Sequence, residues 1–301
     1  MLRFAVNHMT VAKASYQTLL NTAGHCGCVG VEVRDDLVQQ DLVKQDPIKQ
    51  DLANRELANQ LFDGVSPAQA GQMARDADLR ILALAEVKAF NRFSDVVMEQ
   101  VQSLAATATA CGAAGISLIP SNDGAEAGAN APGAELMQAL KEIKPVLAES
   151  NLIGFIEPLG FRTASLRNKA DAVEAIEAAD GAGRFKIIHD TFHHYLAAND
   201  ESNLCGDKAA FYPEHTGLVH ISGVTDQQLQ LHELADEHRV HVDGNDRLGN
   251  VQQLIALTEG GYDGPVSVEA FAPSVHNLAD PTVQLIQSFK YLEAKTNAVT
   301  A

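Results

Sequence analysis

Short apolar runs alternate with longer amphipathic stretches along almost the whole chain, and this alternation constrains the fold more than any other feature of the sequence. We expect eight short runs to be strands: 4–8, 29–34, 81–87, 115–120, 153–157, 185–190, 218–222 and 265–271. Apolar residues three and four positions apart predict helices at 11–23, 66–77, 94–111, 135–149, 169–179, 250–258 and 282–294. Strands that alternate with helices form parallel sheets, and eight such units predict an α/β fold with a closed (β/α)8 barrel, the TIM barrel.

The length of the chain allows one barrel or two ordinary domains. There are 301 residues, of which 46% are hydrophobic, enough for a full core. Because no linker-like segment divides the chain, we predict one TIM-barrel domain over 1–301. A five-residue repeat at 40–54 fits neither helical nor strand periodicity, and Pro47 would break a long helix. We therefore expect a solvated insertion at about 36–60, after the second strand, and a substrate-side loop at 121–133, after the fourth.

The net charge excludes one broad class of partner. The chain carries a formal charge of −17 and has an isoelectric point of about 4.9. Such an acidic protein repels phosphate backbones, so we expect no nucleic-acid partner. No apolar run approaches the roughly 18 residues of a membrane-spanning helix, and the first residues lack the apolar stretch of a signal peptide. We therefore expect no membrane partner and a cytoplasmic location.

Four side chains of metal-ligand type lie at the ends of four successive predicted strands: Glu157, Asp190, His220 and Glu269. Their intervals of 33, 30 and 49 residues fit strand–helix units of about 30 residues or more. Active sites of such barrels lie at the C-terminal ends of the strands, so we expect these groups to converge there. One acidic residue at a strand end is commonly a solvated rim group or a helix N-cap. Four together favour a metal site.

Three carboxylates and one imidazole suit a single divalent cation, Mn²⁺ in the first place or else Zn²⁺, Mg²⁺ or Co²⁺. Four protein ligands leave room for two substrate oxygens in an octahedral shell, such as a carbonyl and a neighbouring hydroxyl. The ion would polarise the carbonyl and acidify the adjacent C–H. A carboxylate on each side of that carbon could remove the proton and return it elsewhere. The set therefore predicts proton transfer through an enediolate.

Polar residues near these strand ends are candidates for contact with a substrate. His193 follows Asp190 by three residues and can reach a substrate hydroxyl, although the position also suits a cap or packing residue of a following helix. Arg162 and Arg239 carry planar guanidinium groups that can bind hydroxyls or neutralise an oxyanion, and Glu86 ends the third strand. Weaker candidates of the same kind are Asn7, His8, Asn122 and Asp123.

Four short segments resemble the xylose isomerase-like TIM-barrel superfamily: Glu157-Pro-Leu-Gly160, Asp190-Thr-Phe-His193, Val219-His-Ile-Ser222 and Ser267-Val-Glu269. The resemblance covers about 4–292, and the nearest likeness is to the inosose (2-keto-myo-inositol) isomerase group and its sugar 3-epimerase relatives. It implies one divalent ion held by four ligands: Glu157, Asp190, His220 and Glu269. It also implies that Glu157 and Glu269 are the acid–base pair and that His193 and Arg239 contact the substrate.

The sequence departs from this family at one place. Many relatives follow the position of Arg239 with a Pro-Gly-x-Gly loop, whereas this chain has a different segment at 240–247, which leaves Arg247 as a rival to Arg239. Because that loop often shapes the substrate end of the pocket, the identity of the substrate is open.

The function that we predict is a metal-dependent isomerase of a keto-polyol such as inosose. A ketose 3-epimerase and an inosose dehydratase would use the same residues, and a non-catalytic polyol-binding barrel is an alternative of another class. DNA-repair nucleases share the barrel but need a larger His-rich cluster and a basic face, which the charge of −17 disfavours. Dimers and tetramers are common among relatives, so a homo-oligomer is a further expectation.

Overall fold

The computed structural model describes residues 1–37, 61–124, 132–200 and 211–299. Its centre is a closed barrel of parallel strands that follow one another in sequence order, and β1 pairs with β8 to close it. The strands are β1 (Arg3–Asn7), β2 (Gly30–Arg34), β3 (Arg80–Lys88), β4 (Gly115–Ile119), β5 (Ile153–Ile156), β6 (Phe185–Asp190), β7 (Thr216–Ile221) and β8 (Pro265–Val268). The predicted (β/α)8 fold is confirmed.

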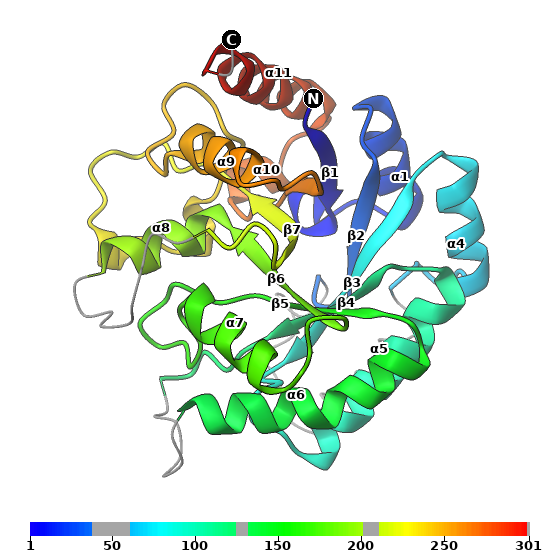
Figure 1. Cartoon of the computed structure of the whole chain (residues 1–301). Helices are drawn as coiled ribbons and strands as arrows, with labels where there is room; N and C mark the ends of the chain where they lie inside the picture. The colour runs from blue at the N-terminus through cyan, green and yellow to red at the C-terminus, as the bar shows by residue number, and fades with distance from the viewer. Residues whose placement is uncertain (38–60, 125–131, 201–210, 300–301) are drawn as a thin grey trace, which may run out of the picture.

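Helices surround the strands on the outside of the barrel (Figure 1). The longer ones are α1 (Tyr16–His25), α4 (Pro67–Asp76), α5 (Asp95–Cys111), α6 (Pro132–Glu149), α7 (Lys169–Ala178), α8 (Thr191–Asn199), α9 (Asn250–Glu259) and α11 (Thr282–Val299). Short helical turns lie in the loops: η1 (His8–Val11), η2 (Leu231–Glu233), η3 (Asp236–His238) and α10 (Pro273–His276). The last helix, α11, lies beside the N-terminus, where Phe289 stacks on Phe4 with ring centroids 4.0 Å apart.

The first helix differs from the sequence prediction. We expected one helix over 11–23, but the structure has the turn η1 first and begins α1 only at Tyr16. Ser15 causes the late start, because its side chain accepts a hydrogen bond from the backbone N–H of Thr18 and so caps the helix. The turn η1 brings the chain from the C-terminal end of β1 back toward the outside of the barrel.

Strand alternation sends the functional side chains into the barrel. In β7, Val219 and Ile221 belong to the apolar core between strands and helices, so His220 between them faces inward. A smaller apolar layer, which includes Phe155, Ile188 and Leu218, fills the interior. Polar residues at the C-terminal ends of the strands therefore lie next to this packed apolar layer.

Some expected segments fall outside the described residues. Most of the insertion expected at 36–60 and the middle of the loop expected at 121–133 belong to them. Among the helices in the described ranges, none combines the length and apolar character needed to cross a membrane.

Candidate metal centre

The four predicted ligands converge at the C-terminal end of the barrel. Glu157 follows β5, Asp190 ends β6, His220 lies in β7 and Glu269 follows β8. One ligand atom from each of them lies within 4.8 Å of the corresponding atoms of the other three. All four side chains are buried, none more than 4% exposed. The barrel therefore brings together groups that are up to 112 residues apart in the chain.

The imidazole of His220 is oriented by carboxylates on both sides. Its Nδ1 lies 3.0 Å from Glu157 Oε1 and 3.2 Å from Glu269 Oε2, so this nitrogen faces the cluster. Burial alone would lower the pKa of His220, but Glu269, Glu32 and Glu157 together raise it well above its ordinary value. A site that gathers this much negative charge around one ring nitrogen fits a cation, and three carboxylates with one imidazole fit a divalent one.

Glu269 is held by hydrogen bonds to both carboxylate oxygens. Its Oε1 accepts from Arg34 Nη1 at 2.7 Å and from Asn7 Nδ2 at 3.1 Å, and its Oε2 accepts from Arg239 Nη2 at 2.9 Å. Burial would raise the pKa of this carboxyl, but His220, Arg239 and Arg34 hold it well below its usual range. Glu269 is therefore a fixed, ionised carboxylate. Asn7, a weaker sequence candidate, supports it directly.

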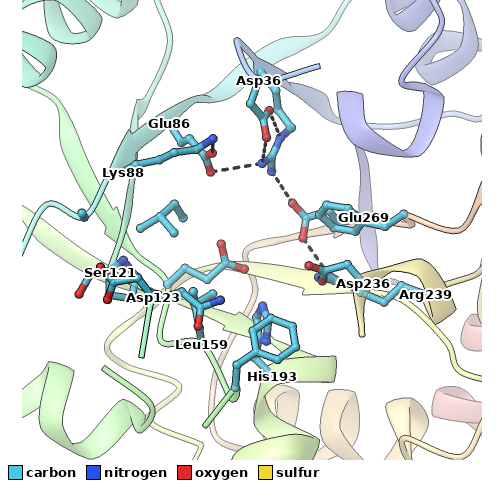
Figure 2. Close-up of a pocket in the computed structure, with 18 residues that line it drawn as sticks. Asp36, Glu86, Lys88, Ser121, Asp123, Leu159, His193, Asp236, Arg239 and Glu269 are labelled. Atoms are coloured by element: carbon cyan, nitrogen blue, oxygen red, sulfur yellow. Dashed lines mark hydrogen bonds and ion pairs between the residues drawn. The ribbon is translucent and has the colours of Figure 1, made fainter. Parts of the chain in front are cut away.

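Arg239 lies beside the cluster and is 1% exposed. Its Nη2 donates to both Asp190 Oδ2 and Glu269 Oε2, its Nε donates to Ser222 Oγ at 2.9 Å, and its guanidinium lies 4.5 Å from the ring centroid of Phe271. Figure 2 shows Arg239 next to Glu269 at the edge of the pocket. The neighbouring carboxylates raise the pKa of Arg239 despite its burial. This residue neutralises two predicted ligands as well as bordering the pocket.

Asp190 also caps a helix. Its Oδ1 accepts a hydrogen bond of 2.8 Å from the backbone N–H of His193, in the first turn of α8. Asp190 is thus a helix N-cap, as expected for many strand-end acids, and its other oxygen, Oδ2, accepts from Arg239 Nη2. Asp190 nevertheless also belongs to the four-residue cluster. The cap also fixes the start of α8, which directs the ring of His193 into the pocket against Phe161, 5.0 Å between ring centroids.

A cavity of about 720 Å³ opens above the cluster (Figure 2). Its apolar walls include Ile119, Leu159, Phe161 and Phe271. Its polar lining contains two predicted ligands, several predicted substrate contacts and five residues that were not singled out in the sequence. The predicted residues are Glu86, Asn122, Asp123, Glu157, His193, Arg239 and Glu269, and the additional ones are Arg34, Asp36, Lys88, Ser121 and Asp236. A volume of this size is typical of small-molecule sites.

The structure places Arg162 away from this cavity. The side chain is 63% exposed, and its guanidinium pairs with Asp200 through bonds of 3.0 and 3.2 Å. Arg247, the rival to Arg239, donates to the backbone carbonyls of Asp226 and Leu229 and so fastens the segment after β7. Neither arginine is among the residues that line the cavity in the described part of the chain.

Comparison with known proteins identifies the fold family. Residues 22–295 match the family model described as the xylose isomerase-like TIM barrel. The chain belongs to this family. The resemblance seen in the sequence is therefore confirmed, over most of the chain. A search of curated proteins gave no match.

Solved structures of several proteins align along nearly the whole chain. A xylose isomerase domain containing protein from Salmonella typhimurium LT2 is 26% identical, covers 98% of this chain and 97% of its own, and has a TM-score of 0.80. The IolI protein, solved with a bound zinc atom, is 16% identical with a TM-score of 0.73, over 99% of each chain. L-ribulose 3-epimerase is 15% identical with a TM-score of 0.67, over 100% of this chain and 96% of its own.

Two residues of β2 enter this family site without having been singled out in the sequence. Arg34 bonds Glu269 and also reaches Asp36 at 2.8 Å and Glu86 at 3.2 Å. It therefore connects the cluster to Glu86, the predicted substrate contact on β3, whose pKa is raised mainly by burial. Glu32 is completely buried and lies 3.0 Å from His220 Nε2. A charged residue between Val31 and Val33 was the available sequence signal for an inward-facing Glu32.

His8, another weaker candidate, faces a different place. Its Nε2 bonds the backbone carbonyl of Ala14 at 2.9 Å, and the residue borders a separate hollow with Asp35 and Asp63. Asn122 and Asp123, in contrast, line the main cavity as predicted for the loop after the fourth strand. The site of this xylose isomerase-like barrel is thus built from residues in or just after all eight strands.

Proposed function

We propose that the chain is a divalent-metal-dependent isomerase of a keto-polyol such as inosose, acting by proton transfer through an enediolate. The observation that carries this proposal is the meeting of Glu157, Asp190, His220 and Glu269 within 4.8 Å at the base of a cavity large enough for a six-carbon polyol. Membership of the xylose isomerase-like family supports it.

The donor set indicates which ions to test. Three carboxylates favour Mn²⁺ or Mg²⁺, and the imidazole also suits Co²⁺ and Zn²⁺. The zinc atom in the structure of the IolI protein supports a site of this kind in the family. Among these ions we expect Mn²⁺ to be the native one. When bound, the ion would supply Lewis acidity toward a substrate carbonyl.

The hydrogen bonds of Glu157 and Glu269 indicate different roles for the two carboxylates in proton transfer. Arg34, Asn7 and Arg239 already donate to both oxygens of Glu269, so this carboxylate is a weak acceptor for a further proton. Glu157 borders the cavity and is bonded through Oε1 to His220. We therefore assign the first proton removal to Glu157 and keep Glu269 as the second member of the acid–base pair.

The cavity walls would orient the substrate. The buried Nδ1 of His193 has no hydrogen-bond partner within the described residues, which leaves it for a substrate hydroxyl. Glu86 and Arg239 lie on two sides of the cavity and offer an acceptor and a donor. Arg162, held by Asp200 outside the cavity, would have no direct role in the step.

Proton exchange tests the proposal directly. Purified protein loaded with Mn²⁺ is incubated with keto-inositols in D₂O, and deuterium in the substrate is measured by NMR. We expect exchange in the native protein and its loss in Glu157→Gln and in Glu269→Gln, whereas Arg162→Met, outside the cavity, keeps it. Unchanged exchange in Glu157→Gln would reject that residue as the base, and binding without exchange in the native protein would favour a polyol-binding barrel.

A ketose 3-epimerase is the second candidate. The structural likeness to L-ribulose 3-epimerase and to a D-allulose 3-epimerase from Methylomonas sp. supports including linear ketoses in the substrate panel. Product NMR separates the reactions: an isomerase moves the carbonyl, an epimerase inverts one carbon, and an inosose dehydratase forms an unsaturated product with loss of water.

A further inference from the structure

We propose that Glu32 is a positioning residue that fixes the orientation and tautomer of His220 and thereby strengthens metal binding. The inference rests on the proposed metal site, since it assigns a role to a residue behind that site. Within the described residues, Glu32 does not line the substrate cavity and has no hydrogen bond to Glu157, Asp190 or Glu269.

The bond between Glu32 and His220 crosses the inside of the barrel. Glu32 lies in β2 and His220 in β7, and these strands are not neighbours in the barrel. Glu32 Oε2 lies 3.0 Å from His220 Nε2, while the opposite ring nitrogen, Nδ1, faces the carboxylates of the cluster. The contact therefore holds the ring from behind, along the line that points to the metal site.

This arrangement selects one tautomer. A carboxylate can only accept at Nε2, so the hydrogen of a neutral imidazole must be there, and the lone pair at Nδ1 is left for the ion. Metal-bound histidines are commonly held in this way by a carboxylate on the far nitrogen, and loss of such a partner typically weakens metal binding by about 10- to 100-fold.

The complete burial of the Glu32 carboxylate indicates a specific role. Glu32 is 0% exposed. In the described part of the chain, its side chain is hydrogen-bonded only to His220, through Oε2, and its Oε1 has no hydrogen-bond partner. A buried carboxylate is unfavourable unless it is paired. A leucine or methionine would fill the same space within the barrel without that cost.

The test compares metal affinity in the native protein and in Glu32→Gln. Binding of Mn²⁺ and Co²⁺ to the metal-free proteins is measured by calorimetry, and the visible spectrum of the Co²⁺ form reports the ligand geometry. We expect about 10- to 100-fold weaker binding in Glu32→Gln and a changed Co²⁺ spectrum. Asp200→Asn is the matched control, because it removes another buried carboxylate, paired with Arg162 and Arg167, outside the site.

The outcomes separate this inference from the function on which it rests. Equal affinity in Glu32→Gln and the native protein, with lower stability only, would make the pair a structural contact and overturn the proposal. Failure of the native protein to bind any divalent ion would instead reject the metal site itself.

A measurement on the native protein covers the case in which Glu32→Gln does not fold. In ¹⁵N-histidine-labelled protein titrated with Zn²⁺, we expect His220 to keep its hydrogen on Nε2 and to show the metal-induced shift at Nδ1. A shift at Nε2, or a hydrogen on Nδ1 in the zinc form, would overturn the proposal.

Discussion

Replacement of Arg239 by methionine should destabilise the metal-free protein strongly and the metal-loaded protein less. The guanidinium is 1% exposed and donates to Asp190 and Glu269, two of the predicted ligands. Methionine keeps much of the apolar contact with Phe271 but leaves both carboxylates without this cation. Breaking a buried ion pair in this way typically costs about 3–5 kcal/mol of unfolding free energy.

A divalent ion should recover part of that loss. The ion would neutralise the same carboxylates as Arg239, and the ion and the guanidinium, both cations, would repel each other. Two unit charges of like sign 4 Å apart repel each other by about 4 kcal/mol at an effective dielectric constant of 20. Without the guanidinium that repulsion is gone, so Arg239→Met should bind Mn²⁺ at least about tenfold more tightly, which narrows the stability gap by about 1.4 kcal/mol at saturating ion.

Urea unfolding followed by circular dichroism, in EDTA and in excess Mn²⁺, gives the four free energies that are needed. Arg162→Met is the matched control, since the same substitution at a 63% exposed arginine should change the stability by less than about 1 kcal/mol. If metal-free Arg239→Met is as stable as the native protein, or if Mn²⁺ leaves the gap unchanged, the guanidinium and the ion do not share the same carboxylates.

Three further outcomes are expected. Gly160→Ala should lower the unfolding free energy by about 1–3 kcal/mol in thermal melts, because the added Cβ would lie 2.3 Å from the backbone oxygen of His193, while Gly183→Ala, with open space around its Cβ, should be nearly neutral. Burial lowers the pKa of His194 to about 3. Between pH 6.5 and 3, His194 is therefore protonated in the unfolded chain but neutral in the folded one. Stability should therefore fall on acidification through that range, less steeply in His194→Gln, by up to about 1.4 kcal/mol per pH unit. When the free ion is present at 100 times its dissociation constant, its removal with EDTA should lower the free energy of urea unfolding by about 2.7 kcal/mol.

The fold was predictable because its two periodicities are local. Strand and helix patterns of about one unit per 30 residues are visible in the sequence and fix the barrel without knowledge of any long-range contact. The helices predicted from apolar periodicity did not include α8, which was considered only as a helix that could follow Asp190, and Asp190 explains why. This residue ends β6 and caps α8 at once, so no turn signal separates the strand from the helix.

The site was predictable mainly for residues at or just after the C-terminal ends of the strands. Glu157, Asp190 and Glu269 could be found because a shared rim follows from the barrel itself. Arg34 was not found, because its role depends on which side chains face each other across the barrel, 235 positions apart in the chain for its bond to Glu269. Glu32 carried a local signal, a carboxylate between two outward-facing valines, but its partner His220 could not be known.

The charges around the cavity argue for a substrate without a charge of its own. Three cationic side chains line it, and each is already paired with carboxylates: Arg239 with Asp190 and Glu269, Arg34 with Glu269 and Glu86, Lys88 with Glu86. A phosphate or carboxylate would have to compete for these cations with acids of the protein. Hydroxyl groups, in contrast, can donate to the carboxylates and accept from the cations at the same time. The cavity therefore favours a neutral polyol over a sugar phosphate, in agreement with the function proposed for this barrel.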